Sequence, residues 1–338
     1  MKNKSINFVI NILIILVVLC LVLFFSLKDN YDEIVNAIIN MNHLCVVLAI
    51  ITLCVCRALI ALTHYMVIKL NNEKVSYLKC LQINFIILFF HGITPFAGGG
   101  QPMEVYYLHN EKIPITKSTN ITLQNFIVYQ ISFVLIGVLA LLFNAHYNLF
   151  GKDHLIKQLV ILGFTINILV LVVTFILSFG KKISRFVLDK LIYIGSKLKI
   201  IKDEVKVREK FNGYLNKFYN NAMELNNHKL KVLKMIFIDF IAIVILYSMP
   251  YFIALGFGIR LSIINTIVTT AYVMTIGSFV PIPGGTGGIE YGFVFFFGYL
   301  ISGSVVNAIM LMWRFVSYYL GMIFGAIALA LYRKRDTV

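Results

Sequence analysis

The stretch Pro281-Ile-Pro-Gly-Gly-Thr-Gly-Gly-Ile-Glu290 has a second, related copy in this chain. Pro95-Phe-Ala-Gly-Gly-Gly-Gln-Pro-Met-Glu104 shares its skeleton of a proline, two residues, a glycine pair, four residues and a glutamate. The register also extends upstream, because Ser76 precedes the first copy by the distance at which Ser262 precedes the second. Self-similarity at a constant offset predicts an internal duplication.

The composition indicates that lipid surrounds part of this chain. Of its 338 residues, 59% are hydrophobic and only 13% are charged. A soluble domain of this length cannot bury so much apolar surface, so lipid must cover part of it. The apolar runs are continuous and longer than the alternating segments of a β-barrel. We therefore predict an all-α polytopic membrane protein.

The apolar runs divide into full spans and interrupted segments. About six runs are long enough to cross a bilayer, and they cover residues 6–27, 44–68, 119–143, 159–179, 235–257 and 305–332. Two more, 80–110 and 263–301, are interrupted by the glycine motifs. We interpret the chain as one membrane domain, 1–338, in which residues 69–145 and 258–332 are the first and second repeat copies.

The basic residues predict the topology. Residues 181–234 hold 14 Lys/Arg against five Asp/Glu, which is typical of the cytoplasmic side. If Cys80–Pro95 crossed the membrane fully, this segment would lie outside. A re-entrant hairpin avoids that conflict, places the acidic loop Lys28–Asn42 outside and leaves both termini in the cytoplasm. The second hairpin then enters from the opposite side, which gives an inverted-topology repeat of the kind that builds transport sites.

The basic segment itself, residues 180–234, has apolar residues at helical spacing. It is either an amphipathic helix on anionic inner-leaflet lipids or a helical connector with a solvated face. No nucleic-acid module accompanies the charge, so we expect no nucleic-acid partner.

The glycine motifs predict a polar site within the membrane. Irregular backbone at this depth requires protein or a wet cavity around it, and glycine amides can converge on an anion such as a lipid phosphate. A tight turn with close helix contact is the alternative. The glycines concerned are Gly98, Gly99, Gly284, Gly285, Gly287 and Gly288.

Four charged residues lie within the motifs or inside neighbouring spans. Glu104 and Glu290 lie in the first turns of the helices that follow the glycines. Each either complements a helix dipole or acts in function, because a carboxylate at this depth is costly. Arg57 and Arg314, each inside a span, are the candidate countercharges and candidate phosphate ligands. Further polar residues could line the same cavity: Gln101, Gln124, Asn125 and Tyr129.

No motif for soluble chemistry is present. The chain has no P-loop, no His-Glu-x-x-His and no Gly-x-Ser-x-Gly, so we predict no catalytic residue, no metal and no cofactor.

The second motif, together with Trp313-Arg314-Phe315, resembles the lysylphosphatidylglycerol synthase transmembrane (flippase-like) family. The likeness extends from about Ile6 to Tyr332. It implies a lipid-translocating domain of a bacterial cytoplasmic membrane, which some members fuse to an aminoacyltransferase that confers antimicrobial peptide resistance. Because the chain stops at Val338, six residues after the last predicted span, we expect it to lack that synthase domain. In the first motif Met103 precedes Glu104, and Tyr107 replaces the arginine usual in the family.

Three hypotheses follow from the residues and the resemblance. The first is a flippase or scramblase for a phospholipid, aminoacylated lipids such as lysyl-phosphatidylglycerol included, or for a polyprenyl-linked lipid. The others are a phosphatidylglycerol lysyltransferase activity and a membrane partner of a separately encoded synthase or glycosyltransferase. On the first hypothesis, Glu290→Gln should abolish translocation and leave protein abundance intact. The lipid, the direction, the energy source and the oligomeric state stay open.

Overall fold

The computed structural model describes residues 31–149, 154–180, 228–278 and 280–333, together with isolated residues between 182 and 213. This part of the chain is helical and contains no strand, which confirms the predicted all-α class. Its helices are α2 (Tyr31–Asn40), α3 (His43–Leu70), α4 (Tyr77–Ile93), η1 (Pro95–Ala97), α5 (Gly100–Asn110), α6 (Ile115–Tyr147), α7 (His154–Phe179), α10 (Lys229–Tyr247), α11 (Met249–Gly256), α12 (Ile263–Gly277), η2 (Pro283–Gly285), α13 (Gly288–Phe297), α14 (Val305–Arg314), η3 (Phe315–Leu320) and α15 (Gly321–Ala330).

Four of the described helical stretches are long and apolar enough to cross a membrane. They are α3, α6, the pair α10–α11, and the run α14–η3–α15. The apolar stretches of α4, α7 and α12 are shorter. The predicted first span, 6–27, and most of the basic segment 180–234 lie outside the described residues, so the count of six spans remains a prediction.

Each glycine motif forms the turn of a helical hairpin. Helix α4 packs against α5, and α12 packs against α13. The equivalent serines begin both hairpins in the same way: Ser76 accepts a hydrogen bond from the amide of Lys79, and Ser262 accepts one from the amide of Asn265. These N-caps satisfy donors that a helix start leaves free.

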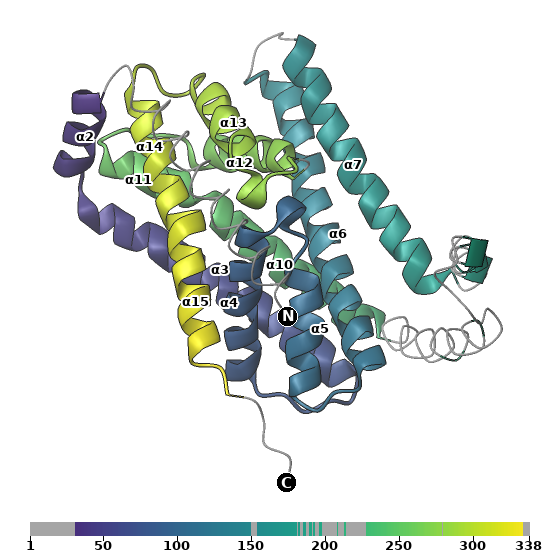
Figure 1. The fold of residues 1–338 in the computed structure, drawn as a ribbon. Coiled ribbons are helices and arrows are strands. Elements are labelled where there is room, and N and C mark those ends of the chain that lie inside the picture. Colours follow the sequence, from purple (N-terminus) through teal and green to yellow (C-terminus); the bar gives the residue numbers. More distant parts are fainter. Residues whose placement is uncertain are drawn as a thin grey trace.

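The turns of the two hairpins, η1 and η2, are in direct contact. In Figure 1 the first hairpin occupies the lower half of the molecule and the second the upper half, and the turns lie between them. The hairpins therefore approach each other tip to tip. The duplication, and the side of the membrane on which each hairpin opens, remain predictions.

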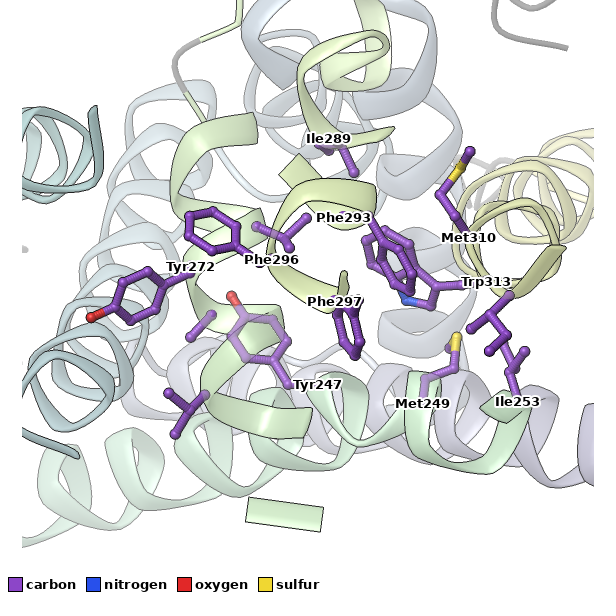
Figure 2. Packing of buried hydrophobic residues seen from close by; sticks show 14 of the residues in the cluster. Tyr247, Met249, Ile253, Tyr272, Ile289, Phe293, Phe296, Phe297, Met310 and Trp313 are labelled. Carbon is purple, nitrogen blue, oxygen red and sulfur yellow. The ribbon is translucent and has the colours of Figure 1, made fainter. Parts of the chain in front are cut away.

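An aromatic core supports the second hairpin. Phe293 of α13 stacks on Phe297, with 4.1 Å between ring centroids, and on Trp313 of α14 at 4.9 Å. Phe296 packs edge-on against Tyr272 of α12 (Figure 2). These large rings are almost fully buried, so they hold α13 firmly between α12 and α14.

The lipid-facing surface shows why the composition is so apolar. Leu169, Val173 and Phe175 of α7 are each more than half exposed. Such exposure is unfavourable in water and favourable against acyl chains. It agrees with a helix that borders a bilayer.

Three local details differ from the sequence-based expectations. Residues 31–40, expected within an outer loop, form helix α2, because half-buried Val35 and Ile38 lie one turn apart and the helix packs on α14. Helix α5 begins at Gly100, inside the glycine motif that was expected only to interrupt the run. The final span contains a π-helix, η3, at residues 315–320.

Candidate functional site

The second turn is organised by a buried ion pair. Arg314 donates from Nε to Oε1 of Glu290 across 2.7 Å, and the two side chains are only 5% and 6% exposed. The other carboxylate oxygen of Glu290 accepts from the amide of Gly287 at 2.6 Å. Glu290 thus caps the start of α13 and neutralises an arginine from the next span.

A second nitrogen of the Arg314 guanidinium also bonds to the turn. Its Nη2 atom donates to the carbonyl of Gly284 at 3.2 Å and to Oγ1 of Thr286 at 3.4 Å. The group also lies 4.4 Å from the ring centre of Tyr318. Its hydrogen bonds go to protein atoms, so in this conformation Arg314 holds the turn together.

Tyr318 links the two hairpins. Its hydroxyl donates to the carbonyl of Gly92, at the end of α4, across 2.9 Å. Gly284 has a positive φ of 67°, and a Cβ atom there would overlap the Tyr318 ring. A side chain at position 284 is therefore excluded by both backbone strain and close approach.

The glycines do not behave alike in the two turns. Gly284, Gly285 and Gly287 adopt positive φ, whereas in the first turn the positive φ values fall on Phe96 and Ala97. Non-glycine residues pay for this conformation in steric strain, which is often stored near functional sites. Glycine thus supplies the left-handed backbone in the second turn only.

The backbone amides of the turns are largely used within the turns. The amide of Gly98 donates to Pro95, that of Gly99 to Oγ1 of Thr94, and that of Gly285 to the carbonyl of Ile282. Gly288 lies close to Val280, which leaves no room for a Cβ atom. These bonds match the tight-turn alternative, so side chains must supply most of the donors for any phosphate.

Glu104 has an environment different from that of Glu290. It lies within α5, away from the helix start, and is 5% exposed. Its Oε1 accepts from Nδ2 of Asn125 at 2.7 Å and lies 3.3 Å from Nδ1 of His64. The equivalent glutamates therefore have a histidine and an amide as partners in one hairpin, and an arginine in the other.

Arg57 lies near the middle of α3, facing the interior. Among the described residues it makes no ion pair or hydrogen bond, and its Nε atom is buried without a partner. It interacts electrostatically with His64, His91 and Tyr129. Arg57 is therefore the intramembrane cation most available to a ligand.

Sequence reasoning missed some of these residues and found others. His64 was not predicted, although it follows Arg57 by two helical turns on the same face of α3, a spacing that could have revealed it. Tyr318 carried no signal of its own. Of the predicted cavity residues, Asn125 contacts Glu104, and Gln124 accepts a hydrogen bond from Asn71 at 2.7 Å.

These features define a multi-pass α-helical membrane protein with buried charges at two apposed helical turns. The lysylphosphatidylglycerol synthase TM region family matches residues 8–325, and the chain belongs to this family. It is also similar to the UPF0104 membrane protein PH1989 of Pyrococcus horikoshii. The two are 23% identical over 332 residues, which cover 95% of this chain and 97% of that protein.

Proposed function

We propose that this protein moves a phospholipid or a polyprenyl-linked lipid between the two leaflets of its membrane, as a flippase or scramblase. The observation that carries the proposal is Arg57. A guanidinium in the middle of a membrane span is costly unless an anion accompanies it, and no carboxylate among the described residues pairs with this one. A lipid phosphate is the anion that a membrane supplies in quantity.

The surroundings of Arg57 suit a head group. Nε2 of His91, at the end of α4, is buried without a partner, and so is Oδ1 of Asp239 on α10. A head group carries both hydrogen-bond donors and acceptors that can satisfy such atoms. Arg57 would bind the phosphate, and Glu104 would accept from a hydroxyl or ammonium group or take up a coupling proton.

The pair Glu290–Arg314 has a different part in this proposal. Arg314 is already bonded to Glu290 and to the second turn, so we propose that it positions the second turn against the first. Family membership supports a lipid-related role, and it does not by itself specify transport.

A groove on the outer surface fits the apolar part of the lipid. It lies between α4 and α15, has a volume of about 340 Å³, and its apolar lining includes Leu81, Phe85, Phe324 and Ile327. An acyl or isoprenoid chain could remain in this groove, exposed to the bilayer, while the head group passes through the interior. Such an arrangement spares the tail any contact with the polar interior.

The test is lipid movement in liposomes that contain the purified protein. Fluorescent phosphatidylglycerol and a fluorescent polyprenyl phosphate are incorporated, and dithionite reports the fraction exposed outside. Arg57→Gln should slow movement at least tenfold, a change that corresponds to roughly 1.4 kcal/mol or more in the barrier to lipid movement. Arg260→Gln, at an exposed loop arginine, is the matched control and should retain the wild-type rate. Equal rates for Arg57→Gln and wild type would remove the proposed role of Arg57.

A further inference from the structure

His64 and Glu104 form a buried pair of titratable groups that the folding of the helices does not explain. Nδ1 of His64 lies 3.3 Å from Oε1 of Glu104, and the side chains are 12% and 6% exposed. Glu290 caps its own helix and neutralises Arg314, whereas Glu104 does neither. Two buried polar groups inside an apolar bundle are expensive to retain for structure alone.

The pair connects three helices of the first half of the molecule. His64 comes from α3, Glu104 from α5, and Asn125, which donates to the same carboxylate oxygen, from α6. Adding a proton to Glu104 would remove its negative charge and weaken both contacts. The protonation state therefore controls how tightly α5 is held to α3 and α6.

The pair also interacts with residues next to the first glycine turn. His64 interacts electrostatically with His91 and with Arg57. The ring of His91 occupies the space where a side chain at Gly100 would begin, at the first residue of α5 after η1. A change of charge at His64 would thus alter the electrostatic potential at Arg57, which is proposed to bind phosphate, and at the tip of the first hairpin.

We propose that His64 and Glu104 bind and release the proton that drives lipid translocation. This inference rests on the proposed function and adds its energy source. One proton passes between the imidazole Nδ1 and the carboxylate Oε1. It is taken up when the site opens to one side of the membrane and released when it opens to the other.

Other titratable or charged groups face this pair from the neighbouring helices. Within the described residues they are Arg57 on α3, Cys80 and His91 on α4, and Asp239 on α10, which contacts Thr63. On α6 the facing residue is the uncharged Asn125. Of the carboxylates that the structure describes, Glu104 alone lies within 4 Å of a histidine nitrogen, so it is the one that can exchange a proton directly with an imidazole.

The experiment imposes a pH gradient of one unit on liposomes of phosphatidylethanolamine and phosphatidylglycerol that contain the full chain. Valinomycin and equal potassium hold the membrane potential at zero, and fluorescent phosphatidylglycerol is the probe. Coupling to one proton should sustain a leaflet ratio of about tenfold, and nigericin should collapse it to unity. Glu104→Gln and His64→Gln should each abolish the ratio. Glu111→Gln should keep it, because that buried glutamate instead pairs with Lys79 and Tyr332.

A second readout needs no transported lipid. Infrared difference spectra recorded across a pH titration should show a carboxyl band that Glu104→Gln removes and His64→Gln shifts. Lipid movement that ignores the gradient in the wild-type protein would overturn the coupling and leave the proposed function standing. Absence of movement with both fluorescent lipids would overturn the function and the coupling together. Loss of the ratio in Glu111→Gln, with retention in Glu104→Gln, would also refute the assignment.

Discussion

Replacing Glu290 by glutamine should destabilise the protein strongly. The change removes the charge that neutralises Arg314, whose side chain is 5% exposed, and weakens the bond from the amide of Gly287. Arg314 would keep its contacts to Gly284 and Thr286, which are both uncharged. The Arg314 charge would then be buried without a countercharge, and this lowers the free energy of unfolding.

The size of the effect follows from the burial. Breaking a buried pair by removing one partner costs about 3–5 kcal/mol. At about 2.1 cal/mol/K per residue, a chain of 338 residues has an unfolding entropy of about 0.7 kcal/mol/K, so that loss corresponds to a fall in Tm of roughly 4–7 °C. This expectation replaces the one drawn from sequence, that Glu290→Gln leaves protein abundance intact.

The assay is thermal unfolding in detergent micelles, followed by intrinsic fluorescence, for the two single variants and their combination. Arg314→Met should be destabilised as much as Glu290→Gln, and the double variant should regain at least half of the loss, because no unpaired charge remains. Glu73→Gln is the control: its pair with Lys117, at 2.8 Å, is partly exposed at 22% and 25%, and such pairs contribute about 0–1 kcal/mol. If Glu290→Gln unfolds within about 2 °C of this control, or if the two single losses simply add in the double variant, the ion pair does not stabilise the turn.

Three further predictions use the same purified protein. Arg57→Gln should be at least as stable as wild type, because the described structure gives Arg57 no hydrogen bond to lose and the change removes a charge without a partner. Slow lipid movement in that variant would therefore report lost ligand binding, and a large fall in Tm would contradict this. Gly284→Ala should cost more than about 2 kcal/mol, because φ at this position is positive and the added Cβ would overlap the Tyr318 ring. Gly287→Ala has open space around its Cβ and should cost only about 1–2 kcal/mol of backbone strain. Thermal unfolding compares the two variants, and equal losses would refute the steric argument. Tyr318→Phe removes the hydrogen bond to the carbonyl of Gly92, so it should lower the free energy of unfolding by about 1 kcal/mol and weaken the contact between the two hairpins. Faster hydrogen exchange at the end of α4 would reveal the weaker contact. Unchanged exchange would show that this bond does not join the hairpins.

The sequence was most informative where its signals were local. The glycine motifs predicted two interrupted hairpins, and helix α3 lies within two residues of the predicted span 44–68. The pairing of Glu290 with Arg314 was also among the predictions, because both residues stand on consecutive helices that run back alongside each other.

Long-range contacts could not be predicted in the same way. His64 and Glu104 meet because α3 and α5 both pack around α4, and no spacing in the chain encodes that packing. The left-handed conformation of Phe96 and Ala97 was equally hidden, because residue type favours glycine for this backbone. Local hydrogen bonds accompany it: the amide of Ala97 donates to the carbonyl of Thr94, and that of Gly98 to the carbonyl of Pro95.

The π-helix η3 has a consequence for the last span. A wide turn inserts one extra residue, and so rotates everything after it by about 100° relative to a continuous α-helix. Before this point Trp313 stacks on Phe293 of the second hairpin; after it Phe324 packs edge-on against Phe85 of the first. The last span therefore packs against both hairpins through two differently oriented faces. Deleting one residue from 315–320 would rotate one of these faces away from its hairpin and leave the other in contact.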